Sequence, residues 1–144
     1  MVSDTRVAEY QTVVAGATTW AESQADIVAV GVVGSWARGT PNADSDVDFV
    51  VLTPRTTAYT EDDGWIEAAI GQTLPVVRRA EWGPLTERRL KLPSGFEIEF
   101  GFVEPSWARI DPIDPGTAEV VADGGLLPVY DPEALLGTLA AATN

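Results

Sequence analysis

The chain contains no cysteine and no histidine. Without cysteine, disulfides, thiolate metal sites and a cysteine nucleophile are excluded. Without histidine, a Ser-His-Asp triad, an imidazole general base and an ordinary zinc site are excluded as well. Any chemistry must therefore depend on carboxylates, hydroxyls, arginine and the backbone. The lack of cysteine favours a reducing compartment, and we expect the protein to be cytoplasmic.

Basic side chains are scarce. Nine Lys and Arg stand against 22 Asp and Glu, which gives a formal charge of -13 and a pI of about 4.1. A phosphate backbone is bound by a basic surface, so we expect no nucleic-acid partner. A cationic partner or a bound divalent metal would suit the charge better. Genome composition or a high-salt habitat explains such a composition equally well, and this alternative stays open.

Long apolar runs are also missing, since none approaches the roughly 20 residues that a membrane span needs. The first residues, Met1 to Arg6, lack the regions of a signal peptide, so we expect no membrane association. A length of 144 residues with 45% hydrophobic and 22% charged residues fits one globular domain over 1–144.

The hydrophobic pattern predicts an α/β (α+β) fold, a mixed β-sheet flanked by helices. Helices are expected over 5–23, 64–70, 115–122 and 132–141, and a turn opening into a short helix is expected at Ser35. Strands are expected over 27–33, 46–52, 76–82, 85–92, 96–103 and 126–130. Gly and Pro between the strands from 76 to 103 predict antiparallel hairpins.

Two aspartates, Asp46 and Asp48, open the buried strand 46–52. Residues two apart on a strand point to the same face, about 6.5 to 7 Å apart, so both carboxylates can converge on one metal site. Hard oxygen ligands select Mg²⁺ or Mn²⁺. Upstream, Gly34 allows close backbone approach, and a turn at Ser35 would direct amide donors and a hydroxyl at phosphate oxygens. The combination predicts a nucleotide site.

Other motifs fit this segment poorly. An EF-hand loop beginning at Asp44 would need glycine where Phe49 stands and glutamate where Arg55 stands. Neither a Walker A motif nor a dinucleotide-binding fingerprint occurs in the chain. The remaining alternative is a solvated turn before an ordinary strand, but two aspartates inside an apolar strand are costly without a purpose.

The pairing of Gly34-Ser35 with Asp46-Val47-Asp48 resembles the DNA polymerase β-like nucleotidyltransferase superfamily, in its minimal single-domain bacterial members. Arg38-Gly39 and Ser45 match the motif of the minimal members, and the similarity is clearest over residues 27–52. Gly95 to Phe100 resembles the family's third-acid strand. The resemblance implies the nucleotidyltransferase fold and a single nucleotidyltransferase domain.

The resemblance also implies a reaction. A nucleoside monophosphate would pass from an NTP bound with Mg²⁺ or Mn²⁺, for which ATP is expected, to an acceptor hydroxyl, with release of pyrophosphate by a two-metal mechanism. The implied catalytic residues are Asp46, Asp48 and either Glu99 or Glu97, and the implied metal ligands are Asp46, Asp48 and Glu99. Both glutamates lie on one face of their strand, and we favour Glu99. The implied nucleotide-binding residues are Gly34, Ser35, Arg38 and Ser45.

The acceptor is not defined by the sequence. It is either a small molecule, for which the acidic charge would suit a polycationic aminoglycoside, or a partner protein. A homodimer is one expected assembly. Two alternatives remain: an antitoxin-type minimal nucleotidyltransferase that modifies a helical toxin, and a nucleotide-binding module without catalysis.

Several basic and aromatic residues permit two interpretations. The cations near the expected hairpins either contact a triphosphate or pair with Glu81, Glu87 and Glu97; they are Arg78, Arg79, Arg88, Arg89 and Lys91. Four tryptophans stand in apolar contexts and are expected in the core, namely Trp20, Trp65, Trp82 and Trp107. Trp36 is expected at the mouth of the site, between Ser35 and Arg38.

Overall fold

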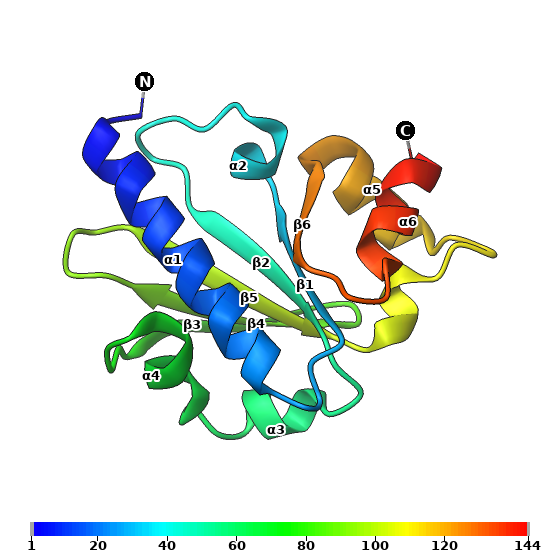
Figure 1. Ribbon diagram of the computed structural model, residues 1–144, viewed down its shortest axis with the longest axis horizontal. Coiled ribbons are helices and arrows are strands. Elements are labelled where there is room, and N and C mark those ends of the chain that lie inside the picture. The colour runs from blue at the N-terminus through cyan, green and yellow to red at the C-terminus, as the bar shows by residue number, and fades with distance from the viewer. Residues whose placement is uncertain (1, 144) are drawn as a thin grey trace.

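The computed structural model describes residues 2–143. At its centre lies a six-stranded sheet in the order β3-β4-β5-β2-β1-β6 (Figure 1). β2 and β5 run parallel, whereas the other neighbouring pairs are antiparallel. The strands are β1 (Ala29–Val33), β2 (Val47–Leu52), β3 (Val76–Trp82), β4 (Leu85–Lys91), β5 (Glu97–Val103) and β6 (Leu126–Tyr130). The predicted mixed sheet and the hairpins between β3, β4 and β5 are confirmed.

The helices are α1 (Asp4–Ser23), α2 (Ser35–Arg38), α3 (Thr56–Thr60), α4 (Trp65–Ile70), α5 (Pro115–Gly124), α6 (Leu135–Thr143) and the 3₁₀ helix η1 (Pro105–Ala108). Side-chain caps fix where the main ones begin. Ser3 accepts a hydrogen bond from the backbone amide of Arg6, and Asp114 accepts one from Thr117. α3 and η1 were not predicted, because neither begins at a side-chain cap and neither is long enough to show a helical period.

The predicted start of the last helix at 132 is wrong. α6 begins at Leu135, because the Asp131 carboxylate accepts hydrogen bonds from the backbone amides of Leu136 and Gly137. The chain therefore makes an extra turn after Asp131 before the helix starts.

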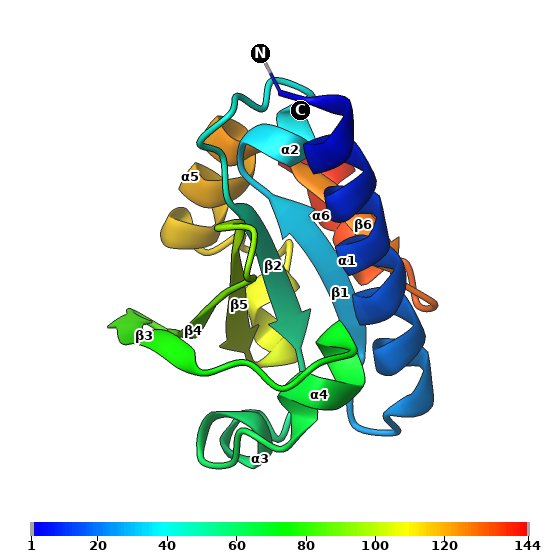
Figure 2. The same cartoon turned by 90° about the vertical axis from the view of Figure 1, so that its left-hand side faces the viewer.

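The two faces of the sheet are covered by different helices. α1, α3 and α4 pack on one face, where Phe49, Phe100 and Phe102 are buried. η1, α5 and α6 pack on the opposite face, over Val50, Leu52 and Val103. In Figure 2, α1 and α5 lie on opposite sides of β1 and β2. The second set of helices leaves the β3–β4 side of its face open, and the site lies there.

Within residues 2–143, no helix combines the length and the apolar character that crossing a bilayer requires.

Candidate active site

Carboxylates from two parallel strands meet on the open face. Asp46 lies immediately before β2, Asp48 lies within it, and β5 supplies Glu97 and Glu99. The register of β2 and β5 places Asp48 beside Glu99, and the two side chains are in hydrogen-bond contact. The Glu99 side chain is 18% exposed, against 35% for Glu97. Glu99 is therefore the more buried glutamate and the one beside Asp48.

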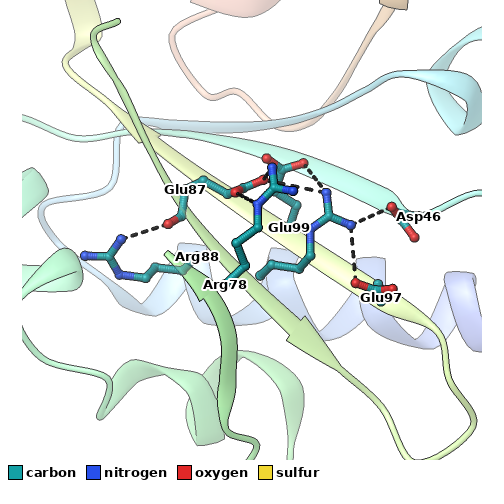
Figure 3. Close-up of polar contacts among 7 residues, drawn as sticks. Asp46, Arg78, Glu87, Arg88, Glu97 and Glu99 are labelled. Atoms are coloured by element: carbon teal, nitrogen blue, oxygen red, sulfur yellow. Dashed lines mark hydrogen bonds and ion pairs between the residues drawn. The ribbon is translucent and has the colours of Figure 1, made fainter. Parts of the chain in front are cut away.

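β4 adds a further carboxylate that the motif did not include. Glu87 is fully buried, and Arg78 on β3 binds it with both ends of the guanidinium, Nε to Oε2 at 2.7 Å and Nη2 to Oε1 at 3.1 Å. Figure 3 shows this pair on neighbouring strands beside Glu99. Glu87 also contacts Glu99, so the acidic groups continue across three strands.

Arg89 on β4 lies among the acids and contacts four of them. Nη1 lies 2.6 Å from Asp46 Oδ2 and 3.4 Å from Glu97 Oε1. Nη2 lies 3.4 Å from Glu99 Oε2 and 3.6 Å from Glu87 Oε1. For Arg78 and Arg89, the structure thus shows the pairing with acids that the sequence offered as one interpretation. Arg79 pairs instead with Asp63, and Arg88 donates to the carbonyl of Thr60.

Crowding of the carboxyls changes their proton affinities. Burial, together with the contacts to Glu87 and Asp48, raises the pKa of Glu99 to about 10. Burial also raises the pKa of Asp48, although the hydrogen bond with Glu99 opposes the rise. Burial would raise the pKa of Glu87 too, but hydrogen bonds with Glu99 and Arg78 lower it below its usual value. Glu99 is therefore the acid that keeps a proton when no further cation is present.

The donor chemistry of this cluster fits a divalent ion. Carboxylate oxygens are the ligands that Mg²⁺ and Mn²⁺ prefer. Asp48 Oδ1 is buried without a hydrogen-bond partner, and a cation would satisfy it. In residues 2–143, however, no three acidic side chains are already gathered around a common ion position. Arg89 contacts Oδ2 of Asp46, so the guanidinium would compete with an ion for that oxygen.

The expected phosphate-binding turn lies next to Asp48. Gly34 has a φ of 86°, and a Cβ there would lie 3.0 Å from Asp48 Oδ2, so only glycine fits between the turn and the carboxylate. Ser35 begins the short helix α2, as the sequence predicted. The last turn of α5 packs against the same turn, since a Cβ on Gly124 would lie 3.2 Å from the Gly34 nitrogen.

Two of the implied nucleotide-binding side chains contact the chain itself. Arg38 donates from Nη1 to the carbonyl of Asp123 at 2.9 Å and so connects α2 to α5. Ser45 Oγ accepts a hydrogen bond from the Asn42 amide at 2.9 Å and holds the loop that leads into Asp46. Both residues shape the surroundings of Gly34 and Asp46.

Two tryptophans are not where the sequence placed them. Trp36 was expected at the mouth of the site, but it is only 9% exposed and stacks on Tyr10 with ring centroids 4.1 Å apart. Trp82 was expected in the core, but it is 59% exposed. Trp82 ends the edge strand β3, where alternation points it to the open face. The expectation is confirmed for Trp20, Trp65 and Trp107, which are buried.

A cavity of about 400 Å³ adjoins the carboxylates. Its polar end contains Asp48, Glu87 and Glu99. Its apolar wall contains Trp82, Leu85 and Trp107. A volume of this size is in the range of small-molecule sites, which are also mostly apolar with a few polar groups.

Comparisons with known proteins agree with this geometry. The model of the nucleotidyltransferase domain family matches residues 18–91, just over half of the chain. This range includes Gly34, Asp46 and Asp48, while Glu97 and Glu99 lie beyond it. No curated protein was found to match the chain.

Solved structures share the fold at low sequence identity. A Cid1 poly(U) polymerase with bound Mg and 3'-dATP has a TM-score of 0.52 and 19% identity over 70% of this chain and 32% of that chain. A cytoplasmic RNA terminal U-transferase has a TM-score of 0.53 and 17% identity over 85% of this chain and 35% of that chain. The chain thus spans about a third of the length of these structures.

The site motif, the sheet topology and the family match lead to the same assignment. The resemblance to the DNA polymerase β-like superfamily is confirmed, and the chain belongs to the nucleotidyltransferase domain family.

Proposed function

We propose that the protein transfers a nucleoside monophosphate from a nucleoside triphosphate, for which ATP is expected, to an acceptor hydroxyl. In this reaction the hydroxyl oxygen forms a bond to the α-phosphorus, and the bond from that phosphorus to the β-phosphate oxygen breaks, so pyrophosphate leaves. The observation that best supports the proposal is the contact of Asp48 with Glu99 directly beside the Gly34 turn, within a nucleotidyltransferase domain.

Each part of the site has a role in this proposal. The turn at Gly34 and Ser35 binds the terminal phosphates through backbone amides. Asp46 and Asp48 would hold Mg²⁺ or Mn²⁺, with Glu99 as the third carboxylate. A bound divalent cation supplies positive charge to the triphosphate. Glu99, once ionised, is placed to accept the proton of the acceptor hydroxyl.

Calorimetric titration of ATP and of GTP, with and without Mg²⁺, tests the nucleotide site. We expect Mg²⁺-dependent binding to the wild type and its loss in the double variant Asp46→Asn/Asp48→Asn, because the carboxylates would hold the ion that accompanies the triphosphate. Asp44→Asn is the matched control, since Asp44 is exposed in the same loop, and it should bind like the wild type.

Thermal melting shows whether each variant is folded. A folded wild type that binds neither nucleotide in the presence of Mg²⁺ contradicts the proposal. Retention of full binding by the folded double variant would contradict the role of the two aspartates.

A second candidate is a nucleotide-binding module without turnover. The contact between Arg89 and Asp46 favours it, because Arg89 already supplies the cation that a metal would otherwise provide. Nucleotide binding without release of pyrophosphate, with any acceptor offered, would support this candidate. Two assemblies stay predictions: a homodimer and a complex with a helical toxin. The mass of the purified protein, measured alone and with a candidate partner, tests both. The cytoplasmic location also stays a prediction.

A further inference from the structure

We infer that the cavity beside the carboxylates binds the acceptor, and that this acceptor is an uncharged, flat, apolar compound with a hydroxyl group whose ring lies on Trp82. The inference rests on the proposed function and specifies its substrate class. Three observations support it: the side of the carboxylates on which the cavity lies, the exposed tryptophan in its wall, and the pairing of its charges.

The first observation is the position of the cavity wall across the sheet. The Gly34 turn follows β1, Asp48 and Glu99 lie on β2 and β5, and Trp82 and Leu85 lie beyond them on β3 and β4. In phosphoryl transfer the attacking and leaving oxygens are roughly in line. With the terminal phosphates at the turn, the attacking hydroxyl therefore approaches from the side of β4 and β3. The aromatic wall is on that side.

The second observation is the wall itself. Two tryptophans line the cavity; Trp107 is 7% exposed, whereas Trp82 is 59% exposed. The guanidinium of Arg78 lies over its ring, 5.6 Å from the centroid, and Arg78 is held in turn by two contacts to Glu87. Trp82 and Leu85 are cross-strand partners at the β3–β4 turn. The ring is therefore held in place, and its exposed surface is available for stacking.

A glycine of β5, Gly101, lies among the residues that line the cavity. A Cβ there would lie 2.7 Å from Leu85 Cδ1. Any side chain at this position would push Leu85 toward the space above it. The cavity thus has its depth because β5 carries no side chain at this point.

The third observation concerns charge. The chain has a formal charge of -13, which would suit a polycation, but the acids in the cavity either pair with arginines or would hold the metal ion. Glu87 is paired with Arg78 and Arg89, Glu99 Oε2 lies 3.4 Å from Arg89 Nη2, and Asp48 would hold the ion. Paired charges bind an additional cation weakly, while the apolar wall favours a neutral ring. The cavity therefore favours a neutral flat acceptor over an aminoglycoside.

The experiment uses 2-naphthol, a neutral flat ring with one hydroxyl, and kanamycin as the polycationic comparison. Each is titrated calorimetrically into the wild type, Trp82→Ala, Trp82→Phe and Ile110→Ala. Ile110 is 46% exposed and lies outside the cavity, so it is the matched control for loss of an exposed apolar side chain. We expect 2-naphthol affinity to fall about tenfold in Trp82→Ala, because stacking and burial on the ring are lost. Trp82→Phe keeps a ring and should lose far less, and Ile110→Ala should bind like the wild type.

Other outcomes overturn the inference. It is wrong if 2-naphthol does not bind, if its affinity is the same in folded Trp82→Ala, or if kanamycin binds more tightly than 2-naphthol. It is also wrong if Trp82→Ala weakens binding of ATP with Mg²⁺ and leaves 2-naphthol unchanged, since the cavity would then hold the nucleobase. Titration of ATP with Mg²⁺ into the wild type tests the proposed function separately. Failure of the acceptor inference can therefore be distinguished from failure of the proposed function.

Discussion

The two faces of β2 and β5 are built from opposite kinds of side chains. On the face below α1, Phe49 stacks on Phe100 with ring centroids 4.9 Å apart, and Trp65 meets Phe100 edge-on. On the other face, Asp48 and Glu99 are direct neighbours, and Arg89 of β4 lies 3.4 Å from Glu99. Alternation along a strand thus places an aromatic core and an acidic site one residue apart.

The difference shows how one sheet serves two purposes. Burial of aromatic rings removes apolar surface from water and stabilises the fold. Burial of carboxylates opposes folding unless each acid finds a partner. The apolar face is covered by α1, α3 and α4, whereas the acidic face depends on Arg78 and Arg89 for compensation. Substitutions on the two faces should therefore differ in size and in their response to metal.

The largest effect is expected on the apolar face. Phe100 is fully buried and contacts four aromatic rings, so Phe100→Ala should lower the free energy of unfolding by about 3–5 kcal/mol through lost burial and a residual cavity. Urea unfolding followed by circular dichroism measures the change. A loss below about 1 kcal/mol would contradict the assignment of this face as the main core.

An intermediate effect is expected at Arg89. Its side chain is 15% exposed, and Arg89→Met leaves its acidic partners uncompensated, which should cost about 1–3 kcal/mol in a buffer with EDTA. Because the ion would no longer compete with the guanidinium, added Mg²⁺ should raise the melting temperature of Arg89→Met more than that of the wild type.

Arg79→Gln is the control for loss of one positive charge. Arg79 and its partner Asp63 are 51% and 42% exposed, so the loss should stay below about 1 kcal/mol and should not change the response to Mg²⁺. An equal stabilisation of the wild type and of Arg89→Met by Mg²⁺ would contradict competition between Arg89 and the ion.

A pH-dependent effect is expected from Glu99. Its pKa is about 10 in the folded protein against an ordinary value of 4.5, so the folded state holds this proton more tightly than the unfolded state. Without divalent ions, its contribution to stability is complete below about pH 4.5 and is lost as the pH rises toward 10. Glutamine cannot ionise, and Glu99→Gln should therefore melt several degrees higher than the wild type at about pH 8 and equally at about pH 4.

Melting temperatures across this pH range, recorded in EDTA, provide the measurement. Glu97→Gln is the matched control on the same strand, and its change should be smaller because Glu97 is about twice as exposed. Parallel pH profiles for the wild type and Glu99→Gln would contradict a raised pKa of Glu99 in the folded state.

Much of the fold was predictable because its signals are local. Apolar alternation placed β1 to β5 to within two residues at each end, and an Asp-Pro pair marked the start of α5. The spacing of Asp46 and Asp48 was readable for the same reason. The sequence could not supply the strand order, and so it could not show that β2 pairs with β5 or that Asp48 lies beside Glu99.

The errors have a common physical origin. Trp36 was expected at the site and Trp82 in the core, yet Trp36 packs against Tyr10 from α1 and Trp82 ends an edge strand. Their burial depends on which element lies opposite, which is a tertiary property. Two other features also depend on the tertiary structure. They are the complete burial of Glu87 and the contacts of Arg89 with acids from neighbouring strand segments.

The parallel pairing of β2 with β5 also has a kinetic consequence. Asp48 and Glu99 are about 50 residues apart in the chain, and closing such a long loop is slow compared with forming the β3–β4 hairpin. Until β5 docks, the acids remain separate and hydrated. The cost of burying the two carboxyl groups together therefore arises late, and it should accelerate unfolding more than it slows folding. An ion that binds the assembled acids would accordingly prolong the lifetime of the folded state while leaving the folding rate nearly unchanged.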